Sequence, residues 1–472
     1  MRDRRLAALV AALALAGCAS LAPPVPEPAP QVVPLEWPLP PLTPARAAPP
    51  QDGTAVATAD VGWREFFAAP QLADVIALAL ANNRDLRVAA LNIERARASY
   101  RIQRAEQVPN VNFGGAATWT GDRNGKQIDG WTAAVDLANY EIDFFGRVRD
   151  LSRAALQQYL AEEETRRAAQ LSLVAEVANA WTTLAADREL LALAELTLRN
   201  RTDALALTER RKELGAISGL ELAQQRTTVE TARTDVARYA GQVARDLNAL
   251  RLLVGADVPP DLLPTTFAAV EIGLAPPPAG LPSEVLLRRP DMLAAEHRLL
   301  AANANIGAAR AAFFPSIKLT AGIGTASDAL FGLLSGASPF WTFGPRITLP
   351  IFDGGRLQGN LDAARADQAI ALASYERAIQ AGFREVADGL ALSGTLAAQR
   401  EAQEALVAAA VNADELSEAR YKAGRDSYLV QLDAQRTRYA AEQSLIQTRL
   451  AEQANRITLY KVLGGGWKEM RG

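Results

Sequence analysis

Residues 147–214 read RVRDLSRAALQQYLAEEETRRAAQLSLVAEVANAWTTLAADRELLALAELTLRNRTDALALTERRKEL, a run of 68 residues that contains neither glycine nor proline. Glycine and proline are the residues that most strongly destabilise a helix interior. The stretch therefore predicts one uninterrupted helix, about 100 Å long at a rise of about 1.5 Å per residue. Because ordinary globular helices rarely exceed about 20 residues, a helix of this length needs other helices packed along it.

A second stretch of the same length, residues 356–423, also lacks proline and begins 209 positions later. The residues around the two stretches repeat at the same interval: Gly146-Arg147 matches Gly355-Arg356, Glu176-Val177-Ala178 matches Glu385-Val386-Ala387, Gly215 matches Gly424, and Gly255 matches Gly464. Upstream the interval is 206 for Pro109 and Pro315, and 210 for Trp131 and Trp341. A repeat this long indicates a duplicated half, not a short solenoid unit, and it predicts structural repeats at 61–270 and 271–472.

The two halves share one predicted order of elements. A helix (71–107 or 283–312) precedes two alternating segments, then come the long helix, a glycine turn and a further helix (216–254 or 425–463). In the first of these last helices the apolar residues Leu222, Val229, Val236, Val243 and Leu250 recur every seven positions. A seven-residue apolar repeat is typical of coiled-coil packing.

The alternating segments are predicted strands. In 315–324 and 339–351, apolar residues such as Leu319 and Phe343 alternate with polar residues such as Thr320 and Thr342, and 111–120 and 131–137 follow the same pattern. Segments of about ten residues with one apolar and one polar face are typical of membrane β-barrels, and tryptophans at strand ends suit an interfacial aromatic girdle. A soluble sheet packed on helices has the same alternation, so this pattern alone leaves both interpretations open.

Four strands per chain are too few to close a membrane barrel, since the smallest barrels have eight. Identical chains favour closed cyclic rings, so two copies give eight strands and three copies give twelve. An eight-stranded barrel is filled by its own side chains, whereas a duct needs the larger number. The expected fold is therefore mainly α-helical with a trimeric, twelve-stranded membrane β-barrel.

The N-terminus has the pattern of a targeting signal. Arg2, Arg4 and Arg5 precede an apolar stretch, residues 6–16, that is too short to span a bilayer, and Leu15-Ala16-Gly17-Cys18 resembles a bacterial lipobox. This predicts a signal peptide at 1–17 and lipidation of Cys18. Residues 18–60 then form a tether, since residues 23–50 contain 12 prolines and cannot build a core. An aspartate after the cysteine would resemble the signal for inner-membrane retention, and here Ala19 stands in that place, which favours the outer membrane.

Composition argues against several classes of function. The net charge is -3 and gives no basic footprint for nucleic acid. Cys18 and His297 are the only cysteine and histidine of the chain, so a Cys/His metal site is nearly excluded. The sequence has no Gly-x-Ser-x-Gly nucleophile elbow and no phosphate-binding loop. We therefore expect no enzyme, no cofactor and no catalytic residues.

Several longer motifs resemble one family. They are Gly62-Trp63-Arg64-Glu65-Phe66-Phe67, Asn83-Arg84-Asp85-Leu86-Arg87, Leu281-Pro282-Ser283, Arg288-Arg289-Pro290-Asp291, Ala308-Ala309-Arg310-Ala311-Ala312-Phe313-Phe314-Pro315-Ser316 and Leu463-Gly464-Gly465-Gly466-Trp467. The chain resembles the outer-membrane factor (TolC-like) family, and within it the OprM/NodT-type lipoproteins of resistance-nodulation-division efflux systems. The resemblance implies a homotrimer in the outer membrane, with a long periplasmic α-helical barrel closed at its tip. It also implies a periplasmic adaptor (membrane-fusion) protein and an inner-membrane resistance-nodulation-division transporter as partners, and the export of drugs or other small toxic compounds.

The glycine turns between the long and short helices have two interpretations. Gly215 and Gly424 suit helix C-caps, and Ser218 and Ser427 suit the next N-caps. In the family this place is the periplasmic tip, where the adaptor docks and the channel closes. The family often has tyrosine three residues before the glycine. Tyr421 fits that pattern, whereas the first repeat has Lys212.

A gate is one hypothesis for the second turn. Three copies of Asp426 that converge near a threefold axis repel one another unless cations pair with them, and Arg425 and Lys212 are the nearby candidates. The alternative is that Asp426 or Ser427 only caps the following helix. At the level of the whole chain, a passive porin or a structural coiled-coil lipoprotein remains the alternative to an efflux duct.

Overall fold

A computed structural model describes residues 20–28, 33–34, 61–121, 127–267, 270, 283–335 and 338–465. The predicted signal peptide, Cys18 and most of the tether lie outside these residues, as do Leu281-Pro282 and Gly466-Trp467 of the family motifs. No helix within the described ranges is both long enough and apolar enough to cross a membrane.

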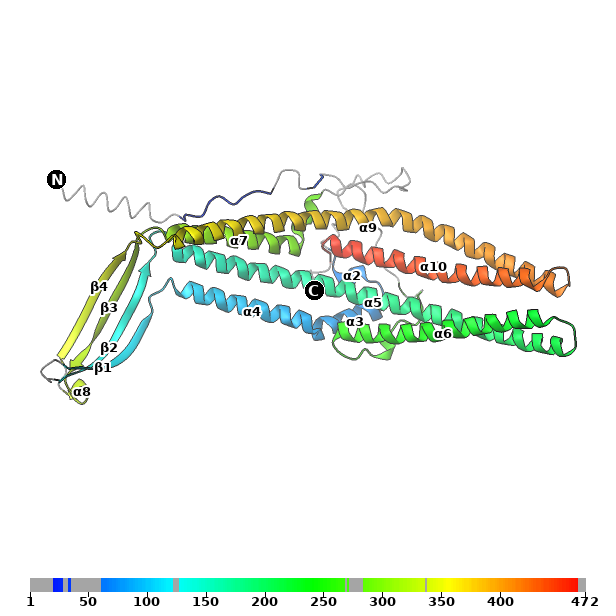
Figure 1. Cartoon of the computed structure of the whole chain (residues 1–472), viewed down its shortest axis with the longest axis horizontal. Coiled ribbons are helices and arrows are strands. Elements are labelled where there is room, and N and C mark those ends of the chain that lie inside the picture. Colours follow the sequence, from blue (N-terminus) through cyan, green and yellow to red (C-terminus); the bar gives the residue numbers. More distant parts are fainter. Residues whose placement is uncertain are drawn as a thin grey trace. The chain divides into compact units, whose positions relative to one another are not determined.

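The two halves share the order helix, strand, strand, long helix and shorter helix, and differ in the short elements around it (Figure 1). The first has α2 (Trp63–Phe66), α3 (Pro70–Asn82), α4 (Arg84–Ala105), β1 (Val111–Gly121), β2 (Gln127–Ile142), α5 (Arg147–Glu213), α6 (Gly219–Val254) and the 3-10 turn η2 (Pro260–Leu262). The second has the 3-10 turn η4 (Ser283–Arg288), α7 (Pro290–Ala311), β3 (Ser316–Ser327), α8 (Gly332–Ser335), β4 (Ser338–Thr348), α9 (Arg356–Lys422) and α10 (Tyr428–Val462). The long helices α5 and α9 have 67 residues each, which confirms the prediction from their composition.

The chain forms two compact units, and each draws on both halves. The sheet unit comprises Met1–Pro30, Leu91–Glu164 and Leu293–Ala378, and the helical unit comprises Gln31–Ala90, Thr165–Met292 and Ile379–Gly472. A repeat of the sequence is therefore not a separate compact unit here.

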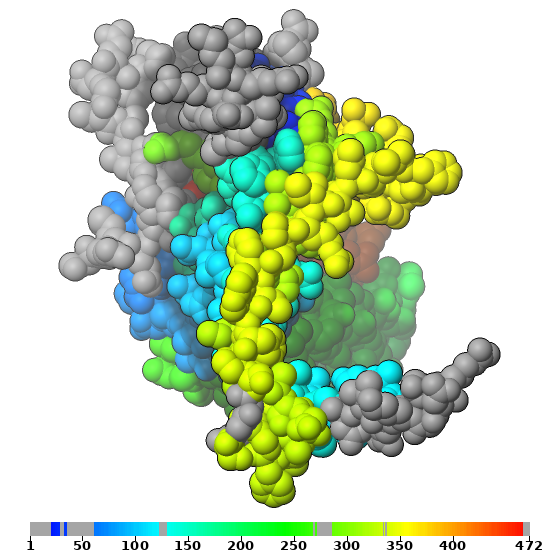
Figure 2. Space-filling view, turned by 90° about the vertical axis from the view of Figure 1, so that its left-hand side faces the viewer, coloured from blue at the N-terminus to red at the C-terminus, as the bar shows by residue number. Residues whose placement is uncertain are grey.

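The four strands form one antiparallel sheet in the order β1-β2-β3-β4. The register places the apolar residues opposite one another: Phe113 pairs with Val135, Val135 with Ile323, and Ile323 with Trp341. Since successive side chains of a strand point to opposite faces, most of the large apolar residues of the four strands share one face, and Phe340 lies on the other. Phe113, Ile323 and Trp341 are 77%, 68% and 76% exposed. Figure 2 shows β3 and β4 at the surface of the molecule.

A β-bulge in β2 keeps that face continuous. The register shifts between Leu137 and Tyr140, and Asn139 has a positive φ of 55°. The shift changes the parity of the strand, so that Tyr140 pairs with Leu319 and Ile142 with Ile317 on the apolar side. The alternation predicted for 131–137 therefore continues to Ile142 in the opposite phase.

The helical unit has the main hydrophobic core. Trp63, Phe66, Trp181 and Leu250 are buried in it, and the ring of Phe66 stacks on Tyr460 with centroids 3.8 Å apart. The Tyr460 hydroxyl donates to the Val61 carbonyl at 2.7 Å. The motif around Trp63 is therefore a core element of this unit. From the predicted seven-residue line, Val229 and Leu250 are buried, and Val236 and Val243 pack against the same core.

Both predicted N-terminal helices of the halves are interrupted. The helix expected over 71–107 breaks at Asn83, whose Oδ1 accepts the Leu86 amide and whose Nδ2 donates to the Leu253 carbonyl, both at 2.8 Å. Gly255 lies against this break, where a Cβ would come within 2.5 Å of the Asn82 carbonyl oxygen. The helix expected over 283–312 is a 3-10 turn up to Arg288 and an α-helix only from Pro290.

Candidate functional site

The two glycine turns of the helical unit have the same backbone geometry. Gly215 and Gly424 have φ values of 74° and 71°. In the first turn the Gly215 amide donates to the Lys212 carbonyl and the Ala216 amide to the Arg211 carbonyl, both at 2.9 Å. The second turn has the same pair of bonds, from Gly424 and Arg425 to Tyr421 and Arg420. This is the Schellman motif, which satisfies the last carbonyls of a helix and requires a left-handed residue, usually glycine.

The serines after these glycines differ in role. The Ser218 hydroxyl accepts the Glu221 amide at 3.1 Å and caps α6, as predicted. Ser427 occupies the N-cap position of α10 but its side chain makes no capping hydrogen bond. The capping interpretation therefore holds in full only for the first turn.

Tyr421 joins the two turns in a polar cluster. Its hydroxyl donates to Glu221 Oε1 at 2.5 Å and accepts from Arg211 Nη1 at 2.9 Å. Arg211 comes from the end of α5, Glu221 from the start of α6 and Tyr421 from the end of α9. Burial and the hydrogen bond to Glu221 raise the pKa of Tyr421, so the phenol keeps its proton and its role as donor at neutral pH.

Tyr428 extends this cluster from the first turn of α10. Its hydroxyl donates to Gln225 Oε1 of α6, and its ring lies 5.7 Å from that of Tyr421. Burial raises the pKa of Tyr428 to about 12. Four helices, α5, α6, α9 and α10, are thus connected at this end of the helical unit through two neutral tyrosines.

Asp426 forms its ion pair inside its own turn. Arg420 Nε and Nη2 donate to the two carboxylate oxygens at 2.6 Å and 2.9 Å. These bonds lower the pKa of Asp426 and keep it ionised. The predicted cations are not its partners in the protomer, because Arg425 and Lys212 are exposed and no ion pair among the described residues includes them. Arg420 is the nearer partner because its own carbonyl accepts the Arg425 amide, and this Schellman bond folds residue 426 back towards the end of α9.

The internal duplication relates Arg420 to an equivalent arginine in the first half of the chain. Arg211 and Arg420 are equivalent residues at the interval of 209, and both precede the glycine by four positions. Arg211 binds Tyr421 and Arg420 binds Asp426, so each repeat uses this arginine on the residues of the second turn. Sequence comparison of the two halves predicts the equivalence, whereas only the structure identifies the partners.

A buried carboxylate pair lies farther along the same helices. Burial and a hydrogen bond with Asp187 raise the pKa of Asp246 to about 7. Asp187 of α5 is 5% exposed, and one oxygen of each carboxyl has no hydrogen-bond partner. The folded protein therefore holds a proton here that the unfolded chain releases near pH 4.

Because of this carboxylate pair, we expect the free energy of unfolding to fall as the pH rises. The folded state binds the proton of Asp246 more tightly than the unfolded chain does. The stabilisation from this proton is therefore complete below about pH 4 and is lost as the pH rises towards 7. With a discount for the partial exposure of Asp246, we expect a loss of about 1–3 kcal/mol between pH 4 and 8. Asp246→Asn should remove this slope in denaturant unfolding. Asp203→Asn, at an exposed position of α5, is the control. An unchanged slope in Asp246→Asn would contradict the assignment.

Comparison with known proteins identifies the chain's relatives. The family model described as outer membrane efflux protein matches residues 75–256 and again 281–465. The chain is 46% identical to the antibiotic efflux pump outer membrane protein ArpC of Pseudomonas putida, over 100% of this chain and 97% of that protein. It is 41% identical to the cation efflux system protein CusC of Escherichia coli, over 99% and 100% of the two chains.

A solved structure has the same fold. The open state of the MtrE outer membrane channel of Neisseria gonorrhoeae matches with a TM-score of 0.86 and 36% identity, over 95% of this chain and 99% of that one. The expected fold class is thereby confirmed: mainly α-helical, with a four-stranded share of a trimeric membrane β-barrel and a long α-helical barrel. The protein is an outer-membrane efflux component and not an enzyme. With two matches that span most of its length, the chain belongs to the outer membrane efflux protein family.

Proposed function

We propose that three copies of this chain form the exit duct of a tripartite efflux pump. The observation that supports this most directly is the continuous apolar face of the sheet together with its two open edges, β1 and β4. Unpaired strand edges are not tolerated in lipid, because each exposed amide and carbonyl lacks a partner there. Pairing β4 of one copy with β1 of the next satisfies both edges, and three copies give the twelve strands of a duct.

The cargo follows from the relatives and from the nature of a duct. One relative is named for antibiotic efflux and another for cation efflux, although both match nearly the whole chain. A shared channel fold with different cargoes suggests that selection occurs elsewhere in the pump. We infer that this duct passes drugs or other small toxic compounds delivered to it.

The partners and the location complete the proposal. A resistance-nodulation-division transporter in the inner membrane delivers the cargo. A periplasmic adaptor contacts the tip turns at Gly215, Ser218, Gly424 and Ser427. The repeats, 61–270 and 271–472, form the periplasmic and membrane parts together. Lipidated Cys18 and the tether 18–60 attach the mature chain to the outer membrane, after removal of the signal peptide 1–17.

The polar cluster at the turns is the proposed resting latch of the periplasmic end. Tyr421 connects α9 to α5 and α6, and Arg420 neutralises Asp426 next to it. In a trimer the three copies of Asp426 repel one another less when each is paired. Lys212 and Arg425 are exposed and remain available for contacts with a neighbouring copy or with the adaptor. Adaptor docking that breaks the Asp426 pair would then bias the tip towards opening.

Asp426→Ala tests the latch in planar bilayers. We expect the wild type to open rarely and the variant to show a raised resting conductance, because Arg420 is left without its carboxylate. The melting temperature should stay nearly constant, since the pair lies at the surface with the Arg420 side chain 56% exposed. Asp433→Ala, at an exposed position of α10, is the matched control.

The outcomes separate the alternatives. A lower melting temperature with unchanged conductance would leave Asp426 with a structural role only. A wild type that stays open would indicate a passive porin, and a wild type without any conductance would indicate a structural lipoprotein. A detergent-solubilised mass of one chain instead of three would contradict the duct itself.

A further inference from the structure

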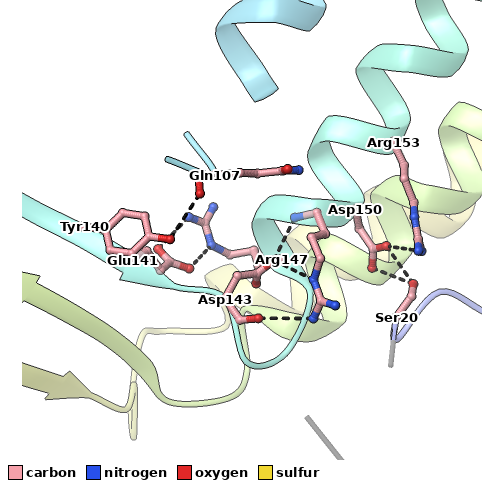
Figure 3. Close-up of polar contacts among 9 residues, drawn as sticks. Ser20, Gln107, Tyr140, Glu141, Asp143, Arg147, Asp150 and Arg153 are labelled. Atoms are coloured by element: carbon pink, nitrogen blue, oxygen red, sulfur yellow. Dashed lines mark hydrogen bonds and ion pairs between the residues drawn. The ribbon is translucent and has the colours of Figure 1, made fainter. Parts of the chain in front are cut away.

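The first described residues of the chain are held in a specific groove of the sheet unit. The Ser20 hydroxyl hydrogen-bonds the carboxylate of Asp150 in the first turn of α5, at 2.7 Å and 2.8 Å from its two oxygens (Figure 3). The amide of Ala22 donates to Ser20 Oγ at 3.1 Å. Asp150 has no exposed surface, so its carboxylate depends on the few donors that reach it.

Helix α7 provides the other wall of the groove. Arg310 Nη1 donates to the Leu21 carbonyl at 3.1 Å, and Asn303 Nδ2 donates to the Pro23 carbonyl at 2.9 Å. Gly307 lies between them, where a Cβ would come within 2.2 Å of Asp150 Oδ2 and 2.8 Å of the Ala22 nitrogen. Only glycine leaves room for the segment at this place. Side chains from both halves of the chain thus hold residues 20–23.

The groove is fixed to the sheet by the junction that follows β2. Arg147 donates to both carboxylate oxygens of Glu141 at 2.8 Å and 2.7 Å, and the Arg149 amide donates to Asp143 Oδ2 at 2.8 Å. Figure 3 shows the Arg147–Glu141 pair and Asp143 near Asp150 at the start of α5. Because Glu141 lies in β2, the Arg147–Glu141 pair links the first turn of α5 to the strand.

We propose that residues 20–23 are a docking segment that sets the position of the acylated Cys18 against the membrane edge of the sheet. The inference rests on the proposed lipidation. Cys18 is two residues from Ser20, so its Cα lies at most about 7 Å from that of Ser20. Without the dock, the next described core residue, Val61, is 43 positions from Cys18, and an extended chain of that length reaches about 140 Å. The ligand of this site is therefore the chain's own lipidated N-terminus, held at one depth in the bilayer.

The dock is tested with a fluorophore beside it. Val25 is 44% exposed, and Val25→Cys provides a free thiol for labelling, since acylation blocks Cys18. The labelled full-length protein is purified with its lipid and reconstituted into phosphatidylethanolamine vesicles that contain nitroxide-labelled lipid. We expect high fluorescence anisotropy and strong nitroxide quenching. Ser20→Ala should lose both, and Ser20→Thr should keep both because it retains the hydroxyl.

Matched controls make the result specific. Ser99→Ala removes a serine hydroxyl from an exposed site of α4 and should change neither signal. Gly307→Ala, which fills the groove, should reproduce the loss seen in Ser20→Ala. If the label in Ser20→Ala stays as rigid and as quenched as in the parent, docking is wrong.

The lipidation of Cys18, on which this inference rests, is measured separately. Mass spectrometry of the N-terminal peptide determines whether Cys18 carries acyl groups. An acyl-free N-terminus would overturn the lipid anchor and this inference with it. An acylated peptide with a freely tumbling label at position 25 would overturn docking alone and leave the anchor intact.

Discussion

Arg289→Ala should lower the free energy of unfolding by about 1.5–3 kcal/mol, the range for losing hydrogen bonds to charged groups, because the guanidinium is buried while its two carboxylate partners are partly exposed. Its side chain is 9% exposed and lies in the helical unit. The guanidinium binds both oxygens of Asp291 at 3.0 Å and 2.8 Å, Glu385 Oε2 at 2.9 Å and the Val462 carbonyl at 3.0 Å. One side chain thus connects the start of α7 with α9 and α10. Its removal leaves two carboxylates facing each other without a cation.

The neighbouring arginine provides the control. Arg288 is exposed, so Arg288→Ala should change stability by less than about 0.5 kcal/mol. Arg289→Lys should recover only part of the loss, because an ammonium group cannot bind two carboxylates and a carbonyl with the geometry of a guanidinium. The measurement is denaturant unfolding followed by circular dichroism. A loss below about 1 kcal/mol in Arg289→Ala would mean that the network contributes specificity and not stability.

Local features of the sequence predicted most of the fold. The absence of glycine and proline over 147–214 marks α5 nearly to the residue, and Gly215 and Gly424 mark the two turns. The strands followed from strict alternation, which is a property of the backbone itself. These signals suffice because each depends on residues that are close in sequence.

Two departures from prediction depend on partners that are distant in sequence. The break at Asn83 is stabilised by the carbonyl of Leu253, 170 positions away. The bulge at Asn139 lies beyond the residues of β2 that pair with β1 and shifts the register against β3, which comes about 180 positions later in the chain. Within one copy Asp426 pairs with Arg420 across the Schellman turn, and its pairing with Arg425 or Lys212 of a neighbouring copy stays a prediction. Proximity in sequence therefore did not predict the side-chain partners at places where the chain reverses its direction.

The second large effect on stability is expected from lysine substitutions on the apolar face of the sheet. Phe343 is the middle residue of β4 (Ser338–Thr348), is 63% exposed and lies on the apolar face. A lysine at a lipid-facing position near the bilayer midplane costs about 2–4 kcal/mol. We therefore expect Phe343→Lys, and Leu319→Lys on β3, to destabilise the assembled protein by that amount.

The adjacent position is the matched control. Thr342 pairs with Gly322 on the opposite face, which lines the lumen of the proposed barrel. A lysine there keeps its contact with water, so Thr342→Lys and Thr320→Lys should cost well under half as much as the substitutions on the apolar face. Unfolding by urea from phospholipid vesicles measures both pairs under the same conditions. Equal losses on the two faces would contradict the assignment of one face to lipid and the other to the lumen. A clear difference would place Phe343 in an apolar surrounding and Thr342 in a wet one, and since Phe343 is 63% exposed within the chain, that apolar surrounding is not the chain's own core.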